Sequence, residues 1–222
     1  MTAPLRIRYR TIEIGNNDIH ICTLRDKQQF SDPKNTALNL GISSATWPIF
    51  GTIWPSSLVL AHHMLNFDIK DKRILELGCG MALSSLLLNA RNADITATDY
   101  HPEVKKFLDR NVQLNNGKDI AFERVDWADD TSELGLFDLI IGSDLLYEDL
   151  HVSLIAQFIE KHTMPKCEII IVDPGRGRKS KLNAKMAEQG FQCDHNKPEN
   201  TDYLQESFKG HILRFYRNNK VN

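Results

Sequence analysis

Strand-like apolar runs alternate with helix-like segments from residue 73 onward, and this alternation restricts the fold of the chain more than any other feature. The strand-like runs are RILELG (73–78), DITATD (94–99), AFERVD (121–126), DLIIGS (138–143) and EIIIV (168–172). Helical patterns fall between them at 81–91, from Pro102 to about Asn115, and at 150–162. Interleaved strands and helices predict an α/β fold with a parallel sheet. EIIIV is apolar on successive residues, which is typical of an interior strand with helices on both faces.

Both ends of the chain show antiparallel patterns. RIRYRTIEI (6–14) and DIHICTL (18–24) alternate apolar and polar residues around the turn sequence GNN, which predicts a β-hairpin. Residues 26–50 lack periodicity, and Pro55 suits the first turn of a helix. After a polar helix near 179–189, FQCDH and GHILRFYR are typical of a closing antiparallel pair. The expected fold is a Rossmann-like, doubly wound sheet of seven strands, with an N-terminal hairpin and arm.

Composition excludes several classes of protein. The 222 residues include 27 Lys and Arg against 29 Asp and Glu, a net charge of −2 that gives little attraction to phosphates and argues against nucleic acid as a partner. No apolar run exceeds four residues, so we expect no membrane span. The opening MTAPLRIRYR has no apolar stretch of the secretory kind, which predicts a cytoplasmic protein. The sequence contains no HExxH motif or CxxC pair, so we expect no metal site and four free cysteines.

A glycine turn and a spaced acid indicate a nucleoside site. The first strand of the α/β region ends in ELGCG (76–80), where glycines let a ligand approach the backbone closely. Asp99 ends the next strand, 19 residues after Gly80, from where a carboxylate accepts hydrogen bonds from both hydroxyls of a ribose. GCGMAL has Leu83 where a dinucleotide fingerprint has its last glycine, and no P-loop GK[ST] is present. These residues therefore favour a nucleoside without a pyrophosphate.

The motifs ILELGCGMA and TATDYHPEV resemble the glycine loop and ribose acid of the seven-strand S-adenosylmethionine-dependent methyltransferases. Three further stretches, TIWPSSLVLAHHM, VDWADD and FDLIIGSDLLYEDLH, resemble methyltransferase family 16, which includes protein-lysine methyltransferases. The resemblance implies S-adenosylmethionine as the cofactor. It also suggests a division into residues 1–50, the hairpin and arm, and residues 51–222, the methyltransferase region, both within the same domain.

The resemblance assigns roles to individual residues. The cofactor-binding set that it implies is Trp54, Glu76, Gly78, Cys79, Gly80, Asp99, Asp126, Trp127 and Ser143. Gly78 and Gly80 would pack under the methionine part, and Asp99 would hold the ribose. Trp127 would lie against the adenine with Asp126 near its amino group. Trp54 would close over the cofactor, and Ser143 would present its backbone to it.

Asp144 and Tyr147 are the expected catalytic pair, because the resemblance places the SDLLY stretch at the substrate. A lysine amine is protonated at neutral pH and must lose a proton before it attacks a methyl group. We hypothesise that Asp144 accepts a hydrogen bond from the amine and that Tyr147 fixes its direction. The expected substrate is a protein lysine; a small-molecule amine and a catalytically inactive cofactor-binding partner module remain alternatives. The loop with Arg176, Arg178 and Lys179 is either solvated or a dock for an acidic substrate.

Overall fold

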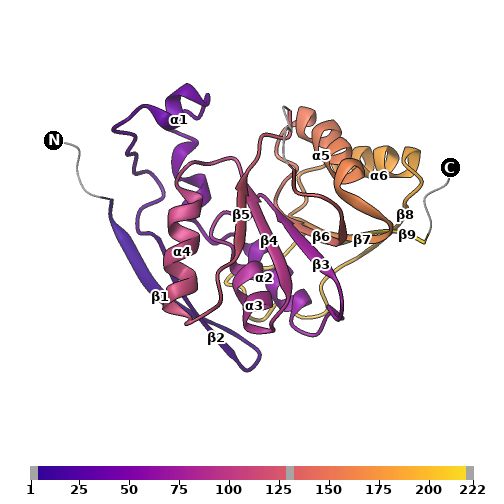
Figure 1. The fold of residues 1–222 in the computed structure, drawn as a ribbon, viewed down its shortest axis with the longest axis horizontal. Helices are drawn as coiled ribbons and strands as arrows, with labels where there is room; N and C mark the ends of the chain where they lie inside the picture. The colour runs from indigo at the N-terminus through magenta and orange to yellow at the C-terminus, as the bar shows by residue number, and fades with distance from the viewer. Residues whose placement is uncertain (1–4, 129–132, 219–222) are drawn as a thin grey trace.

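A seven-stranded sheet forms the centre of the protein in the computed structural model, which describes residues 5–128 and 133–218 (Figure 1). Its strands are β3 (Arg73–Leu77), β4 (Asp94–Asp99), β5 (Ala121–Arg124), β6 (Phe137–Ser143), β7 (Thr163–Asp173), β8 (Gln192–Asn196) and β9 (His211–Arg217). The strand order is β5-β4-β3-β6-β7-β9-β8, and β9 runs antiparallel to both of its neighbours. The predicted parallel sheet with a closing antiparallel pair is confirmed.

Helices cover both faces of this sheet, so the doubly wound architecture is also confirmed. The helices are α2 (Pro55–Met64), α3 (Leu83–Ala90), α4 (Val104–Leu114), α5 (Asp149–His162) and α6 (Lys179–Glu188). Ile74, Ile170 and Val172 point into a core shared with α2, α3 and α4. Leu75 and Ile171 point into a second core shared with α5 and α6. The consecutive apolar residues of β7 thus divide between two cores, as side-chain alternation along a strand requires.

The predicted N-terminal hairpin consists of β1 (Ile7–Ile14) and β2 (Asn17–Leu24), joined by a two-residue turn that Gly15 begins at φ +59°. Asn111 of α4 and Asn115, the residue that follows this helix, hydrogen-bond the free edge of β2. The Asn111 amide accepts from the Cys22 N–H at 2.7 Å and donates to the Cys22 carbonyl at 3.3 Å. The Asn115 amide makes the same pair of bonds to His20, at 2.8 and 2.7 Å. These side chains take the place of a neighbouring strand and fix the hairpin to the α/β core.

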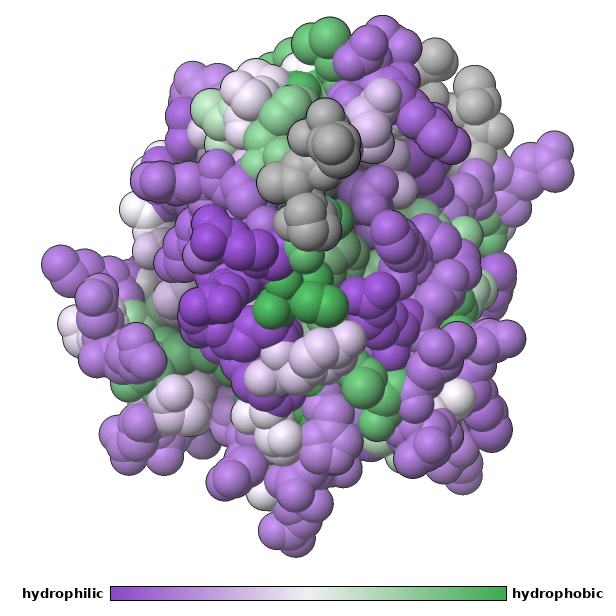
Figure 2. Space-filling model, turned by 90° about the vertical axis from the view of Figure 1, so that its left-hand side faces the viewer, coloured by the Kyte–Doolittle hydropathy of each residue, from purple (hydrophilic) through white to green (hydrophobic). Residues whose placement is uncertain are grey.

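The surface of this side of the molecule carries mostly hydrophilic side chains, with small apolar areas between them (Figure 2). Arg8 and Arg10 of β1 are exposed, whereas Ile14 and Ile21 are fully buried in the core beneath the hairpin. The hairpin therefore shares one core with α2, α3 and α4. The boundary at residue 50 remains a prediction.

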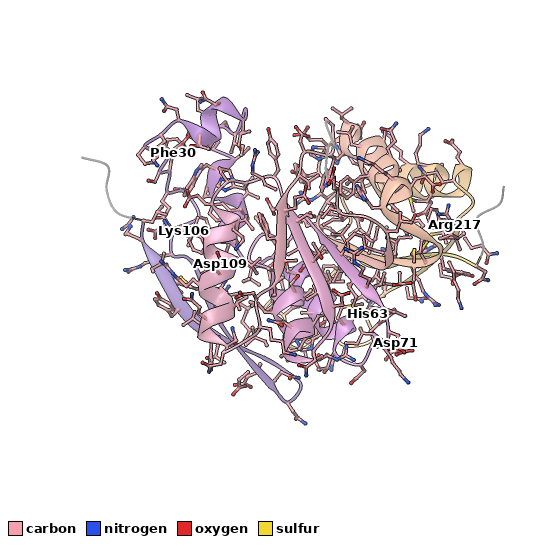
Figure 3. The ribbon with its side chains drawn as sticks, viewed as in Figure 1. Phe30, His63, Asp71, Lys106, Asp109 and Arg217 are labelled. Atoms are coloured by element: carbon pink, nitrogen blue, oxygen red, sulfur yellow. The ribbon has the colours of Figure 1, made fainter. Side chains whose placement is uncertain are left out.

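The arm contains two short elements that the sequence did not indicate, α1 (Thr36–Asn39) and the 3-10 helix η1 (Trp47–Gly51). Trp47 is 1% exposed and packs edge-on against Phe30, Phe50 and His101 at ring distances of 5.9, 5.4 and 5.4 Å (Figure 3 labels Phe30). Elements of four or five residues are too short to show a periodicity, and these aromatic contacts hold η1 in place. In the part of the chain that the structure describes, each helix is too short or too polar to cross a membrane.

Candidate functional site

The turn after β3 requires glycine at two positions. Gly78 has φ +56° and Gly80 has φ +51°, a conformation that costs other residues energy. A Cβ on Gly78 would lie 2.7 Å from Cδ2 of Leu145, and a Cβ on Gly80 would lie 3.1 Å from the Phe50 carbonyl oxygen. The Cys79 N–H donates to the Thr98 carbonyl at 2.9 Å, which ties the turn to β4. Leu145 and the Phe50 carbonyl therefore pack closely against this turn, and glycine at both positions avoids the clash and the backbone strain.

Asp99 joins the glycine turn to the turn that follows β4. Its Oδ2 accepts a hydrogen bond from the Gly80 N–H, and its Oδ1 accepts one from the His101 N–H, both at 2.8 Å. Burial raises the pKa of Asp99, while hydrogen bonds from the backbone of His101, Gly80 and Tyr100 limit the rise. The residue is only partly buried, and each carboxylate oxygen has a second lone pair. Asp99 can thus hold the turn and accept two further hydroxyl groups at the same time.

Glu76 lies beneath the turn and is 4% exposed. Its Oε2 accepts hydrogen bonds from the N–H of Ser85, at 2.9 Å, and from the Ser85 hydroxyl. Burial raises the pKa of Glu76 to about 7. Glu76 therefore fixes the first turn of α3 to β3. The direct cofactor contacts expected of Glu76 and of the buried Cys79 remain predictions.

Trp127 lies beside the glycine turn, although 49 residues separate it from Gly78 in the sequence. A Cβ on Gly78 would lie 3.8 Å from the Trp127 ring. The Trp127 and His151 rings pack edge to face, with their centroids 5.8 Å apart. The preceding Asp126 accepts a hydrogen bond from the Ala128 N–H at 2.8 Å, which shapes the loop after β5. The structure thus places the Trp127 ring next to the turn. The position expected of Asp126 near the cofactor remains a prediction.

Trp54 and Ser143 connect the surrounding elements. The Trp54 indole N–H donates to the Ile49 carbonyl at 3.3 Å, and the ammonium of Lys27 lies 5.9 Å from its ring, so Trp54 attaches the arm to the start of α2. The Ser143 hydroxyl at the end of β6 donates to the Ser57 hydroxyl of α2 at 3.3 Å. The cofactor contacts expected of both residues remain predictions.

Asp144 and Tyr147 follow β6, the neighbour of β3 in the sheet. Asp144 adopts φ +55°, and its N–H donates to the Val172 carbonyl of β7 at 2.9 Å. The Tyr147 ring is half exposed and meets the His151 ring edge-on at 4.4 Å. Burial raises the pKa of Tyr147, and so do the nearby charges of Asp99 and Asp144 among others. The phenol is therefore neutral at physiological pH. The two carboxylates that raise its pKa come from the ends of β4 and β6, the strands on either side of β3.

Two features at the end of β7 were not predicted from the sequence. Asp173 is 2% exposed and lies next to Asp144, at the end of the neighbouring strand. Its Oδ2 accepts a hydrogen bond from the Gly175 N–H at 3.1 Å. Its Oδ1 has no hydrogen-bond partner among the described residues. Burial raises the pKa of Asp173. An acid directly after the apolar run EIIIV was the available signal. The Arg176 guanidinium, which the sequence leaves either solvated or as a dock for an acidic substrate, pairs with both carboxylate oxygens of Asp144.

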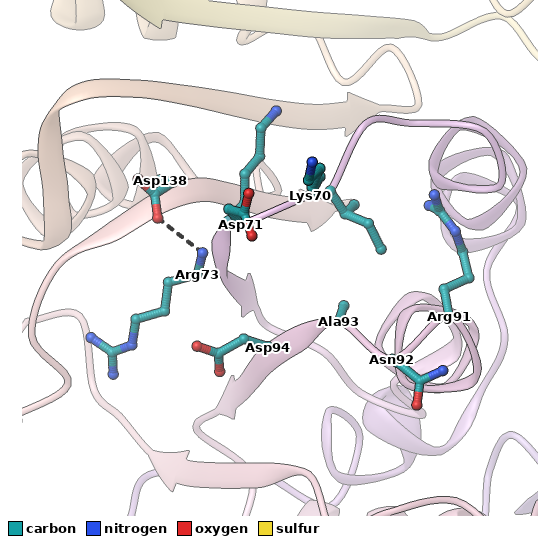
Figure 4. Close-up of a pocket in the computed structure, with 10 residues that line it drawn as sticks. Lys70, Asp71, Arg73, Arg91, Asn92, Ala93, Asp94 and Asp138 are labelled. Carbon is teal, nitrogen blue, oxygen red and sulfur yellow. Dashed lines mark hydrogen bonds between the residues drawn. The ribbon is translucent and has the colours of Figure 1, made fainter.

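A cavity of about 440 Å³ lies at the other end of the sheet (Figure 4). Arg73 and Asp94, the first residues of β3 and β4, line it, and the Arg73 N–H donates to Asp138 at 2.9 Å. In parallel α/β sheets, ligands bind beyond the carboxyl ends of the strands, where the glycine turn lies. This cavity is therefore separate from the candidate site. Within residues 5–128 and 133–218, no group of three His, Cys, Asp or Glu side chains is arranged for a metal ion.

The fold is that of the methyltransferases. A solved ribosomal protein L11 methylase from Lactobacillus delbrueckii subsp. bulgaricus matches 73% of this chain and 78% of its own, with a TM-score of 0.58 and 21% identity. A 16S rRNA N2 G1207 methyltransferase from T. thermophilus matches 96% of this chain and 51% of its own, with a TM-score of 0.59 and 16% identity. At such low identities the likeness concerns the fold alone.

A family model described as lysine methyltransferase matches residues 34–189, and the chain belongs to this family. Protein N-lysine methyltransferase METTL21A of Danio rerio is 31% identical, over 47% of this chain and 52% of its own length. Protein-lysine N-methyltransferase EFM2 of Saccharomyces cerevisiae is 33% identical, over 59% of this chain and 36% of its own length. Histone-arginine methyltransferase METTL23 of Xenopus laevis is 25% identical, over 64% of each. The matches thus span between about one third and two thirds of these relatives.

Proposed function

We propose that this protein is an S-adenosylmethionine-dependent protein-lysine N-methyltransferase. The observation that carries the proposal is the convergence of the glycine turn, Asp99 and the Asp144–Tyr147 pair at the carboxyl ends of neighbouring strands. Family membership and the two lysine-specific relatives support a lysine acceptor. The net charge of −2 favours a protein acceptor over nucleic acid.

The residues present fit the proposed cofactor. Gly78 and Gly80 have positive φ angles that favour glycine, and without side chains at these positions a ligand can approach the backbone of the turn closely. Asp99 keeps a lone pair on each oxygen, which suits the two hydroxyls of a ribose. Trp127 offers an aromatic surface next to the turn, against which an adenine can stack, with Asp126 near its amino group. When bound, S-adenosylmethionine supplies an electrophilic methyl group on a sulfonium; its transfer breaks the carbon–sulfur bond, forms a carbon–nitrogen bond and leaves a neutral thioether.

The chain's own residues then position the acceptor. The lysine binds as an ammonium and gives up one proton to water before the attack, because only the neutral amine has the lone pair that attacks. The Asp144 carboxylate accepts a hydrogen bond from the amine, and the neutral phenol of Tyr147 fixes the direction of the lone pair. After transfer the nitrogen is cationic again, and Asp144 stabilises that charge. Orientation of this kind contributes much of the rate in a displacement that requires an in-line approach.

We also propose that the protein acts in the cytoplasm. All four cysteines are free, and three of them are buried, which is typical of a reducing compartment.

Transfer of labelled methyl groups to a lysate depleted of methylation tests the proposal. We expect the wild type to label one or a few proteins on lysine. Asp144→Asn should reduce labelling about ten-fold or more, since a charge-assisted hydrogen bond to the amine is lost. Its affinity for S-adenosylmethionine should stay within about two-fold of wild type. Asp109→Asn, which changes an exposed acid of α4, is the matched control.

The other outcomes separate the alternatives. Label on arginine would move the acceptor to that of the METTL23 relatives. Label only in small molecules would favour a metabolite amine, and cofactor binding with no labelling at all would favour an inactive binding module. If the protein does not bind S-adenosylmethionine, the proposal is wrong.

A further inference from the structure

Arg176 occupies both oxygens of the expected catalytic carboxylate. Its Nε donates to Asp144 Oδ1 at 2.6 Å, and one terminal nitrogen donates to Oδ2 at 2.9 Å. This is the two-pronged geometry in which arginine binds carboxylates most firmly. The Asp144 side chain is 11% exposed, so the guanidinium covers most of the surface through which another cation would reach it. A substrate ammonium therefore has to displace Arg176 before it can contact Asp144.

The loop that carries Arg176 is built so that this side chain can leave. Gly175 and Gly177 flank it at φ +100° and +81°, and a Cβ on Gly177 would meet no described atom within 4 Å. The Arg176 side chain is itself 41% exposed. Asp173 holds the start of the loop through the Gly175 N–H. The loop thus has a fixed base, an open tip and a cation that can rotate toward the solvent.

Displacement leaves a guanidinium without its counter-ion. Arginine stays charged at all physiological pH values, so the freed group needs a new anion nearby. The charge of Asp173 also acts on Arg176, but Asp173 is 2% exposed, so a guanidinium that turns toward the solvent moves away from it as well. Asp149 already pairs with both Arg178 and Lys181. An acidic side chain beside the substrate lysine could take Arg176 while the lysine takes Asp144. Such an exchange keeps both ion pairs and leaves no charge unpaired.

We propose that Arg176 is a specificity-determining residue that selects acceptor lysines with a neighbouring aspartate or glutamate. The inference rests on the proposed function and names its substrate class. A lysine among neutral residues has to break the Arg176–Asp144 pair without replacing it. The difference corresponds to one partly exposed ion pair, which gives a preference of about five-fold for acidic neighbours.

A peptide library with a fixed central lysine tests the preference. Each flanking position carries Glu or Gln, or Asp or Asn, and labelled S-adenosylmethionine reports transfer. We expect the wild type to prefer acidic neighbours about five-fold in kcat/KM. In Arg176→Gln the preference should fall to about one, because transfer to neutral peptides gains while the contact with the acid is lost. Arg176→Lys should keep part of the preference, since the cation remains. Lys181→Gln removes one cation from another pair and should behave like the wild type.

The ratio between acidic and neutral peptides is a readout that a folding defect does not change, because both peptides are tested on the same preparation. If the wild type labels lysate proteins but not peptides, the same comparison is made on the labelled lysine sites and their flanking residues. Equal transfer to acidic and neutral acceptors, or a preference that survives in Arg176→Gln, would overturn the inference. Absence of transfer to any acceptor would instead refute the proposed function.

Discussion

Asp99→Asn tests whether one carboxylate both holds the glycine turn and binds the cofactor. In the structure Asp99 Oδ2 accepts a hydrogen bond from the Gly80 N–H, and Oδ1 accepts one from the His101 N–H. The amide of asparagine has one oxygen and one NH₂ group. In either orientation of the amide, the NH₂ group faces a backbone N–H and cannot accept a hydrogen bond from it. The substitution therefore removes one acceptor without changing the shape of the side chain.

The expected losses follow from these contacts. One buried N–H without a partner costs about 1–3 kcal/mol of the free energy of unfolding. One ribose hydroxyl also loses a charge-assisted acceptor worth about 1.5–3 kcal/mol. At about 1.4 kcal/mol for each factor of ten, the affinity for S-adenosylmethionine should fall about ten- to one-hundred-fold. The loss of affinity is thus at least comparable to the loss of stability.

Titration calorimetry with S-adenosylmethionine and urea unfolding measure the two losses on the same preparations. Asp109→Asn is the control, because Asp109 lies on the exposed side of α4 in an ion pair with Lys105 (Figure 3). It should change the free energy of unfolding by less than about 0.5 kcal/mol and leave the affinity unchanged. An Asp99→Asn protein that is less stable but binds as tightly as the wild type would show that Asp99 only supports the turn. A protein that loses neither would refute the reasoning altogether.

Two further predictions concern buried polar groups. Asn111→Ala should lower the free energy of unfolding by about 2–4 kcal/mol, because it removes two hydrogen bonds to Cys22 and leaves a buried N–H and carbonyl unpaired. Asn115→Ala should lower it less, because the hydrogen bonds of Asn115 to His20 are exposed. Equal losses for the two variants in urea unfolding would contradict this account. Glu76→Gln should flatten the pH dependence of stability. The folded pKa of about 7 lies above the ordinary 4.5, so the folded wild type binds more protons than the unfolded chain and loses stability as the pH rises from 4.5 through 7. Thermal melts of the variant should show a smaller decline over this range, because only the contribution of Glu76 is removed; an unchanged decline would contradict this account.

Local patterns account for most of the fold that could be predicted. The apolar run of β7, the alternation of β1 and β2 and the proline at the start of α2 are each visible within about ten residues. The arm could not be predicted in the same way. Trp47 is held by residues as distant as Phe30 and His101, and α1 and η1 are too short to be periodic.

The candidate site divides similarly. The resemblance indicated Gly78, Gly80, Asp99 and Asp144 because each belongs to a contiguous motif. The motifs did not show that Glu76 supports α3, because the buried hydrogen bond between Glu76 and Ser85 is visible only in the structure. Asp173 lies outside these motifs, and only its position directly after the apolar run EIIIV could have indicated it.

The sequence by itself determined the succession of strands and helices along the chain, the glycine turn and the acid at the end of β4. These features depend on short stretches of chain and on the sterics of single residues. Only the tertiary structure decided what those groups contact. Asp144 and Arg176 are 32 residues apart and meet because β6 and β7 are parallel neighbours, so their loops emerge at the same edge of the sheet. The pairing of two charges depends on distance in space, and strand order sets that distance.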